Sequence, residues 1–183
     1  MMFTSQRWRF ATVVLITLAA LAAASCSVEE SLRPPRCTGG SGLISAQSVP
    51  TAQWLPCFNT LPDGWSYSTV RIDQGGTRVR LDSDRAGDNA AEMGFYESCD
   101  LGEAVSVPSS LDQAIQFDSI ERLEGGYKAE TFYLFEGGCV RWRFDFDSDA
   151  AASESIALRD SVQLLSRNDV NDDLRESFID EDL

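Results

Sequence analysis

Two apolar, aromatic segments joined by a glycine pair constrain the fold of this sequence most strongly. Residues 127–135 and 139–147 have β-strand character, and Glu136-Gly137-Gly138 between them predicts an antiparallel hairpin. Apolar and charged residues alternate along the second strand, with Val140, Trp142, Phe144 and Phe146 on one face and Arg141, Arg143, Asp145 and Asp147 on the other. One face of the predicted sheet therefore packs on a core and the other meets water.

Three more segments favour strands. Residues 65–73 and 77–82 flank Gln74-Gly75-Gly76, which predicts a second hairpin, and residues 90–99 alternate between apolar and polar positions. Residues 109–124 have no clear period and are expected to form a weak helix or a long loop.

Helical spacing begins near the C-terminal end. Residues 149–165 predict a helix with Ser148 as its N-cap. Its mainly apolar stripe comprises Ala152, Ile156, Arg159, Val162 and Leu165. The acidic end, residues 166–183, carries apolar residues four apart that favour a short second helix. The expected fold class is α+β, with an antiparallel sheet of about five strands and one or two C-terminal helices packed on one face.

The first 26 residues have the three zones of an export signal. Arg7 and Arg9 precede the apolar run of residues 10–24, and small residues lead to Cys26. As a helix this run would rise roughly 22 Å, short of the roughly 30 Å hydrocarbon core of a membrane. The stretch LAAASC resembles a bacterial lipobox, in which the cysteine is lipidated and becomes the new N-terminus.

Two alternatives to lipidation stay open. Ala22 and Ala24 also fit an ordinary signal-peptidase site that would release the protein, and the apolar run can remain as an uncleaved signal anchor. Each alternative places the domain at the extracytoplasmic face of the cell membrane or beyond it. The predicted organisation is a signal peptide and lipobox (1–26), a flexible Ser/Pro/Gly-rich tether (27–50) and a single extracytoplasmic domain (51–183).

The cysteine count agrees with export. With Cys26 reserved for lipid, four cysteines remain, an even number that suits two disulfides in an oxidising compartment. Cys99 ends one predicted strand and Cys139 begins another, so antiparallel neighbours would bring them together. The expected pairs are Cys99–Cys139 and Cys37–Cys57, the second tying the tether to the domain.

Composition excludes several function classes. The chain has no histidine, which removes Ser-His-Asp and Cys-His catalysis and histidine-ligated zinc. All 29 acidic residues but only 13 of the 15 basic ones follow Cys26, so that part carries a net charge of −16. Such a surface repels phosphate backbones, and nucleic-acid binding is not expected.

Three segments are similar to those of a family of actinobacterial envelope proteins without an assigned activity. They are LPDGWSY from Leu61, LDSDRAG from Leu81 and YLFEGGCVRWRFDF from Tyr133. The resemblance covers about residues 50–175. It implies membrane association at the cell exterior and no catalytic role.

Two constellations resemble catalytic or metal sites only in part. Residues 81–88 have the acids and glycine of the start of an EF-hand loop, but Ala86 and Met93 occupy ligand positions, and turn formation explains the same residues. Asp145 and Asp147 share a strand face, as a glycosidase pair would, although solvated charges are the simpler interpretation. We therefore expect no metal, no cofactor and no catalytic residue.

The remaining candidate is a set of arginines on two outward strand faces, namely Arg78, Arg80, Arg141 and Arg143. If their strands lie close together, they form a forked donor surface for carboxylate or phosphate groups. Otherwise each pairs with a neighbouring acid such as Glu92, Glu130 or Asp145. The predicted function is a non-enzymatic, membrane-anchored envelope lipoprotein that binds an envelope protein or a small anionic ligand; the alternative is a carboxylate-based envelope hydrolase.

Overall fold

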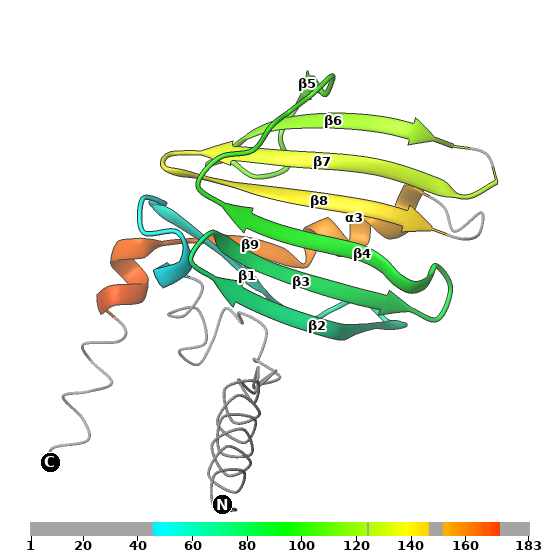
Figure 1. The fold of residues 1–183 in the computed structure, drawn as a ribbon, viewed down its shortest axis with the longest axis horizontal. Helices are drawn as coiled ribbons and strands as arrows, with labels where there is room; N and C mark the ends of the chain where they lie inside the picture. Colours follow the sequence, from blue (N-terminus) through cyan, green and yellow to red (C-terminus); the bar gives the residue numbers. More distant parts are fainter. Residues whose placement is uncertain (1–45, 124, 147–151, 173–183) are drawn as a thin grey trace, which may run out of the picture. The chain divides into compact units, whose positions relative to one another are not determined.

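Alternating apolar and polar residues build a larger sheet than the sequence predicted. The computed structural model describes residues 46–123, 125–146 and 152–172. Within them, seven strands form one antiparallel sheet (Figure 1). In spatial order they are β2 (Trp65–Asp73), β3 (Gly76–Ser83), β4 (Gly87–Tyr96), β8 (Gly138–Phe146), β7 (Tyr127–Phe135), β6 (Ile115–Arg122) and β5 (Val105–Val107).

A second layer covers one face of this sheet. Strand β1 (Trp54–Phe58) pairs antiparallel with β9 (Val162–Ser166), and helix α3 (Ala152–Asp160) lies on the same side (Figure 1). The Phe58 ring of β1 meets the Trp142 ring of β8 edge-on, with the ring centroids 6.1 Å apart. We call the face covered by this layer the inner face and the opposite one the outer face.

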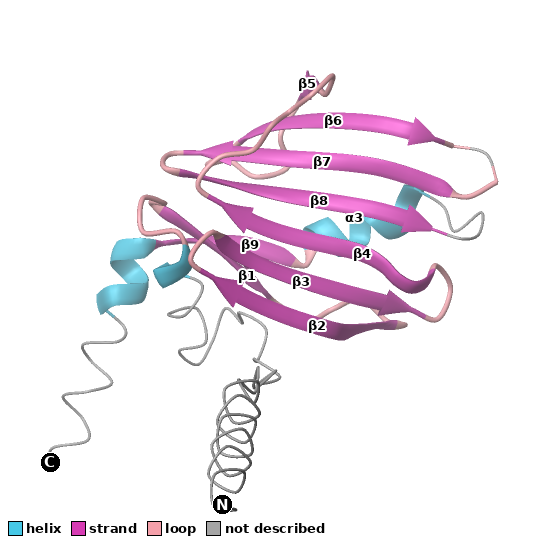
Figure 2. Ribbon diagram, in the orientation of Figure 1, coloured by secondary structure: helices cyan, strands magenta, loops and turns pink. Residues whose placement is uncertain are grey.

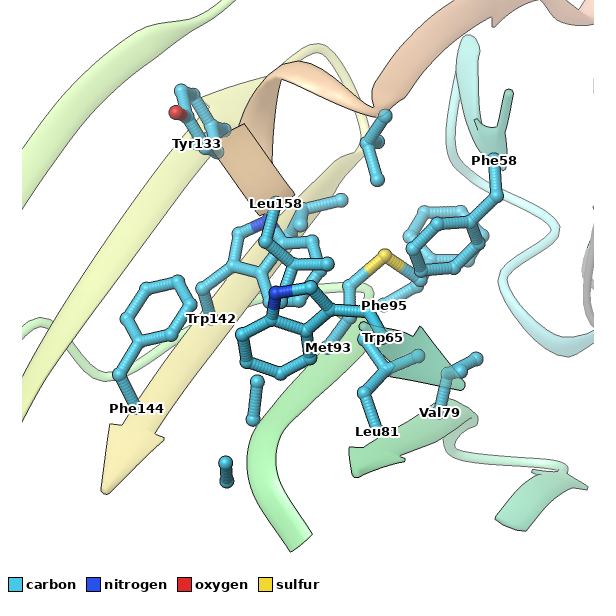
Figure 3. Packing of buried hydrophobic residues seen from close by; sticks show 14 of the residues in the cluster. Phe58, Trp65, Val79, Leu81, Met93, Phe95, Tyr133, Trp142, Phe144 and Leu158 are labelled. Atoms are coloured by element: carbon cyan, nitrogen blue, oxygen red, sulfur yellow. The ribbon is translucent and has the colours of Figure 1, made fainter. Parts of the chain in front are cut away.

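The core lies between the two layers (Figure 3). Because side chains alternate along a strand, every second residue of the central strands reaches it. Its largest fully buried side chains include Phe58, Met93, Phe95, Tyr133, Trp142, Phe144 and Leu158. Burying one such aromatic or aliphatic side chain contributes about 1.5–3 kcal/mol, so these residues supply much of the stability of the domain.

The predicted α+β fold class is wrong, because the described residues are mostly β-structure (Figure 2). The five predicted strands correspond to β2, β3, β4, β7 and β8. Strands β1, β5, β6 and β9 were not predicted. Residues 109–124, expected to be a helix or loop, contain β6, whose partly exposed position leaves its apolar pattern weak. Strand β1 is short, and four of its five residues are buried, so it has no alternation to detect.

The predicted helix 149–165 is also corrected. Helix α3 ends at Asp160, and the chain then enters β9, which takes over the apolar residues at the end of the expected stripe. Leu158 is the buried anchor of α3, whereas Ile156 of the predicted stripe is 48% exposed. Pairing with β1 therefore overrides the helical period after Asp160.

The predicted Cys99–Cys139 disulfide is present, with the two Cα atoms 6.2 Å apart. Its geometric reason is also confirmed, since Tyr96 near the end of β4 pairs with Cys139 at the start of β8. Cys57 is disulfide-bonded as well. Its predicted partner Cys37 lies outside the described residues, as do Cys26, the leader and most of the tether.

The chain enters the domain before Thr51. Ala46 and Val49, at the end of the predicted tether, are buried in the core. Arg167, after β9, donates hydrogen bonds from Nη2 to the carbonyl oxygens of Ala46 and Val49 at 3.1 and 2.8 Å. Burial lowers the pKa of Arg167 below its usual value. In the described part of the chain, no helix has the length and apolar character needed to cross a membrane.

Candidate functional site

The four predicted arginines lie together on the outer face. Strands β3 and β8 are separated only by β4, and the arginines of both strands lie on the face that points away from the core. Neighbouring strands lie roughly 4.8 Å apart, so arginines on β3 and β8 are roughly 10 Å apart at their Cα atoms. The strand register arranges them in two rows across the sheet.

The first row, which we call the Gly94 row, crosses five strands. Arg71 of β2 is opposite Arg78 of β3, which is opposite Gly94 of β4. Gly94 is opposite Arg141 of β8, and Arg141 is opposite Phe132 of β7. The guanidinium carbon of Arg141 lies 5.8 Å from the centre of the Phe132 ring. This row therefore contains three arginines and no acid.

The second row, the Glu92 row, alternates in charge. Arg80 of β3, Glu92 of β4, Arg143 of β8 and Glu130 of β7 follow one another across the sheet. Arg80 Nε donates to Glu92 Oε2 at 2.8 Å, and Arg143 Nε lies 3.3 Å from Glu130 Oε1. Each positive charge of this row thus has an acid beside it.

The arginines of the Gly94 row reach acids outside their own row. Arg78 Nη2 donates to Asp73 Oδ2 at 3.3 Å, and Arg141 Nη2 donates to Glu130 Oε1. The two possibilities left open by the sequence therefore coexist: the strands are close, and the arginines still form ion pairs. Exposed ion pairs contribute only about 0–1 kcal/mol, so Asp73 is a weak competitor for Arg78, whereas the Arg141–Glu130 pair is partly buried.

Tyr96 lies over the centre of the Gly94 row. A Cβ atom added to Gly94 would stand 2.6 Å from both Cζ and Oη of Tyr96, so the absence of a side chain makes room for the ring. Burial raises the pKa of Tyr96, Glu92 raises it further, and Arg78 and Arg141 oppose this. The phenol is therefore protonated at neutral pH and can donate a hydrogen bond.

Beside the Glu92 row is a surface hollow of ≈ 230 Å³. Its charged lining consists of Arg80, Lys128 and Arg143 with Glu92, Glu121, Glu130 and Asp145. Lys128 Nζ lies 2.7 Å from Glu121 Oε2, and its hydrogen bond lowers the pKa of Glu121. Asp145 pairs with Arg122 outside the hollow, and the other lining charges pair with one another.

The inner face carries a polar cluster that sequence reasoning missed. Arg159 of α3 donates from Nη1 to Thr131 Oγ1 at 3.3 Å and lies 3.8 Å from Asp118 Oδ1. The Tyr133 hydroxyl lies 3.0 Å from Ser110 Oγ, and burial raises the pKa of Tyr133. This cluster was missed because Asp118 lies on β6, which was not predicted as a strand.

The other sequence candidates have structural explanations. Asp82 Oδ1 accepts a 2.6 Å hydrogen bond from the Asn89 amide, so this part of the EF-hand-like stretch supports the β3–β4 turn. Among the described residues, no group of three or more His, Cys, Asp and Glu side chains is arranged to hold a metal. Asp145 pairs with Arg122 at 3.1 Å, and its proposed partner Asp147 lies outside the described residues.

Four residues at the Gly94 row were not singled out from the sequence: Arg71, Gly94 and Phe132 within the row, and Tyr96 above it. A signal for Arg71 was present. The pairing of Asp73 with Gly76 leaves a two-residue turn, and this register places Arg71 opposite Arg78. The cysteine positions predicted β4 and β8 as antiparallel neighbours, but no local pattern predicts their register, so the placement of Gly94 and Tyr96 between the arginines follows only from the fold.

The comparisons with known proteins identify no family. No protein-family model matches the chain, and no curated protein is similar to it in sequence. One similar solved structure is a protein from Bacteroides thetaiotaomicron VPI-5482, with a TM-score of 0.39 and 9% sequence identity. The match covers 75% of this chain, which spans 50% of that protein.

Proposed function

We propose that this chain is an exported, lipid-anchored and non-enzymatic binding protein. Its N-terminus holds it at the extracytoplasmic face of the cell membrane, and the outer face of its sheet binds anionic groups of an envelope partner or small ligand. Anchoring follows from the basic, apolar and small-residue zones that end at Cys26. The Cys99–Cys139 disulfide supports an oxidising compartment, where such bonds persist.

The observation that carries the binding proposal is the strand register of β3, β4 and β8. It gathers Arg78, Arg80, Arg141 and Arg143 on one face, although the part of the chain after Cys26 carries −16. Guanidinium groups bind carboxylates and phosphates through paired N–H donors. A local concentration of arginines on an acidic protein is therefore a selective surface for anions.

The hydrolase alternative has less support. A carboxylate-based general acid needs a carboxyl group that stays protonated near neutral pH. Within the outer-face hollow, the Lys128 hydrogen bond shifts the pKa of Glu121 in the opposite direction. Asp145, the described member of the candidate pair, forms an ion pair with Arg122.

Calorimetry on the full-length protein in detergent tests the binding proposal. Inorganic phosphate and acetate are titrated into wild type and into the double variant Arg80→Ala with Arg141→Ala. This variant removes one arginine from each row. A double variant of Arg33 and Arg36 to alanine, in the predicted tether, is the control with the same change in net charge. We expect binding to weaken at least tenfold only in the outer-face variant; equal heats in all three proteins would contradict the proposal.

A further inference from the structure

The two arginine rows differ in how their charge is compensated. In the Glu92 row, acids occupy positions between and beside the arginines. In the Gly94 row, Arg71 and Arg78 are directly opposite each other, and the central strand supplies a glycine where the other row has Glu92. Like charges directly opposite on neighbouring strands are unfavourable, and such local violations concentrate at functional sites.

Donors remain unused in the Gly94 row. Arg78 and Arg141 contact Asp73 and Glu130 through Nη2, and neither forms another hydrogen bond within the described ranges. Arg141 Nε is buried without a hydrogen-bond partner. The Tyr96 hydroxyl likewise makes no hydrogen bond to any residue that the structure describes. Each guanidinium has five N–H donors, so the existing ion pairs do not exhaust them.

We propose that the Gly94 row is a binding site for a phosphate group, with Arg78 and Arg141 on its two sides and the Tyr96 hydroxyl donating from above Gly94. Arg71 adds positive charge at the β2 end of the row. This site deepens the proposed function, on which it rests, by naming one subsite and one ligand class. Donors that converge from three side chains suit the several oxygens of a phosphate better than the two of a carboxylate.

The acidity of the whole protein does not prevent this binding. At physiological ionic strength the Debye length is about 8 Å, so exposed acids farther away are largely screened. Glu92 also acts on Tyr96, and it is held by Arg80 of the neighbouring row. The other close acids are Asp73 and Glu130, and each already contacts an arginine of the Gly94 row. A phosphate would share the two arginines with these acids through their unused donors.

The test is a titration of the full-length protein in detergent with inorganic phosphate, followed by NMR chemical shifts of the backbone amides. Tyr96→Phe keeps the ring over Gly94 and removes only the hydroxyl. Arg78→Gln with Arg141→Gln removes the two flanking charges. Arg80→Gln with Arg143→Gln is a comparison variant, because it removes the same charge from the Glu92 row of the same face. Arg33→Gln with Arg36→Gln, in the predicted tether, is the control outside this face. Acetate is titrated in parallel.

We expect Tyr96→Phe to weaken phosphate binding about tenfold, as the loss of a hydrogen bond to a charged group does. The Arg78 and Arg141 variant should weaken phosphate binding more strongly than this, the Glu92-row variant should weaken it less than the Arg78 and Arg141 variant, and the tether control should leave it unchanged. Acetate should bind wild type at least tenfold more weakly than phosphate. Weakening confined to the Glu92-row variant would overturn the subsite and leave the proposed anion-binding face intact. Equal affinity in all variants would overturn both, and acetate binding as tightly as phosphate would overturn the ligand class.

Discussion

The indole Nε1 of Trp65 donates a hydrogen bond of 3.2 Å to Glu154 Oε2, and this bond joins the first residue of β2 to helix α3. Trp65 is buried, and its ring packs on Phe146 of β8 at 5.9 Å between centroids. The other carboxylate oxygen of Glu154 lies 3.1 Å from Arg85 Nη1 in the β3–β4 turn. Glu154 therefore connects the helix to two separate parts of the sheet.

Replacing Glu154 with alanine should destabilise the domain by about 1–3 kcal/mol, because the buried indole N–H of Trp65 loses its acceptor. Glu154→Gln keeps an acceptor and loses only the ion pair with the half-exposed Arg85, so it should cost about 0–1 kcal/mol. Urea unfolding of both variants measures the difference. Ser153→Ala, at the exposed neighbouring position, is the control, and an unchanged midpoint for Glu154→Ala would contradict this account.

Removing the Cys99–Cys139 disulfide should have a larger effect. The double variant Cys99→Ala with Cys139→Ala should lose about 2–5 kcal/mol of unfolding free energy, because the bond restrains a long loop in the unfolded chain. Non-reducing peptide mapping of wild type should also recover Cys37–Cys57. A peptide that links Cys37 to Cys99 would contradict the pairing.

Tyr133 should make the stability of the domain fall at alkaline pH. Burial raises its pKa above the usual value of 10.0, so above that pH the unfolded state releases the proton first and binds fewer protons than the folded state. The free energy of unfolding then decreases as pH rises, by at most about 1.4 kcal/mol per pH unit for one group. Well below pH 10 this contribution does not change with pH.

Denaturant unfolding between pH 9 and 11 checks the alkaline prediction. Tyr133→Phe loses the hydrogen bond with Ser110 at every pH but should show a shallower fall than wild type, because one ionising group is gone. The slopes are compared rather than the absolute stabilities. Identical slopes in the two proteins would show that Tyr133 ionises alike in the folded and unfolded states.

The predicted anchor is tested at Cys26. Intact-mass analysis of protein extracted from membranes should find a lipid-modified N-terminal cysteine at position 26. Cys26→Ala should accumulate as uncleaved precursor or appear in the medium. A mature N-terminus at Ser25 would rule out lipidation at Cys26 and favour an ordinary signal peptidase.

The central strands were predictable from local pattern because their side chains alternate between a buried face and a solvent-exposed face. Strands β2 and β7 have the predicted bounds, and β3, β4 and β8 differ by a few residues at their ends. The Cys99–Cys139 pair followed from the same strand map. Strands β6 and β9 were missed because local propensity there is weak, and pairing with β7 and β1 decides their conformation.

By itself, the sequence determined the β2–β3 and β7–β8 hairpins, which faces of β3 and β8 carry arginines, and that Cys99 pairs with Cys139 through neighbouring strands. Only the tertiary structure decided the register between β4 and β8, two strands far apart in the chain. That register places Gly94 between Arg78 and Arg141 but Glu92 between Arg80 and Arg143. Alternation within a strand is a local property, whereas the register between distant strands depends on how the whole sheet buries its core, and the difference between the two arginine rows arises from that register.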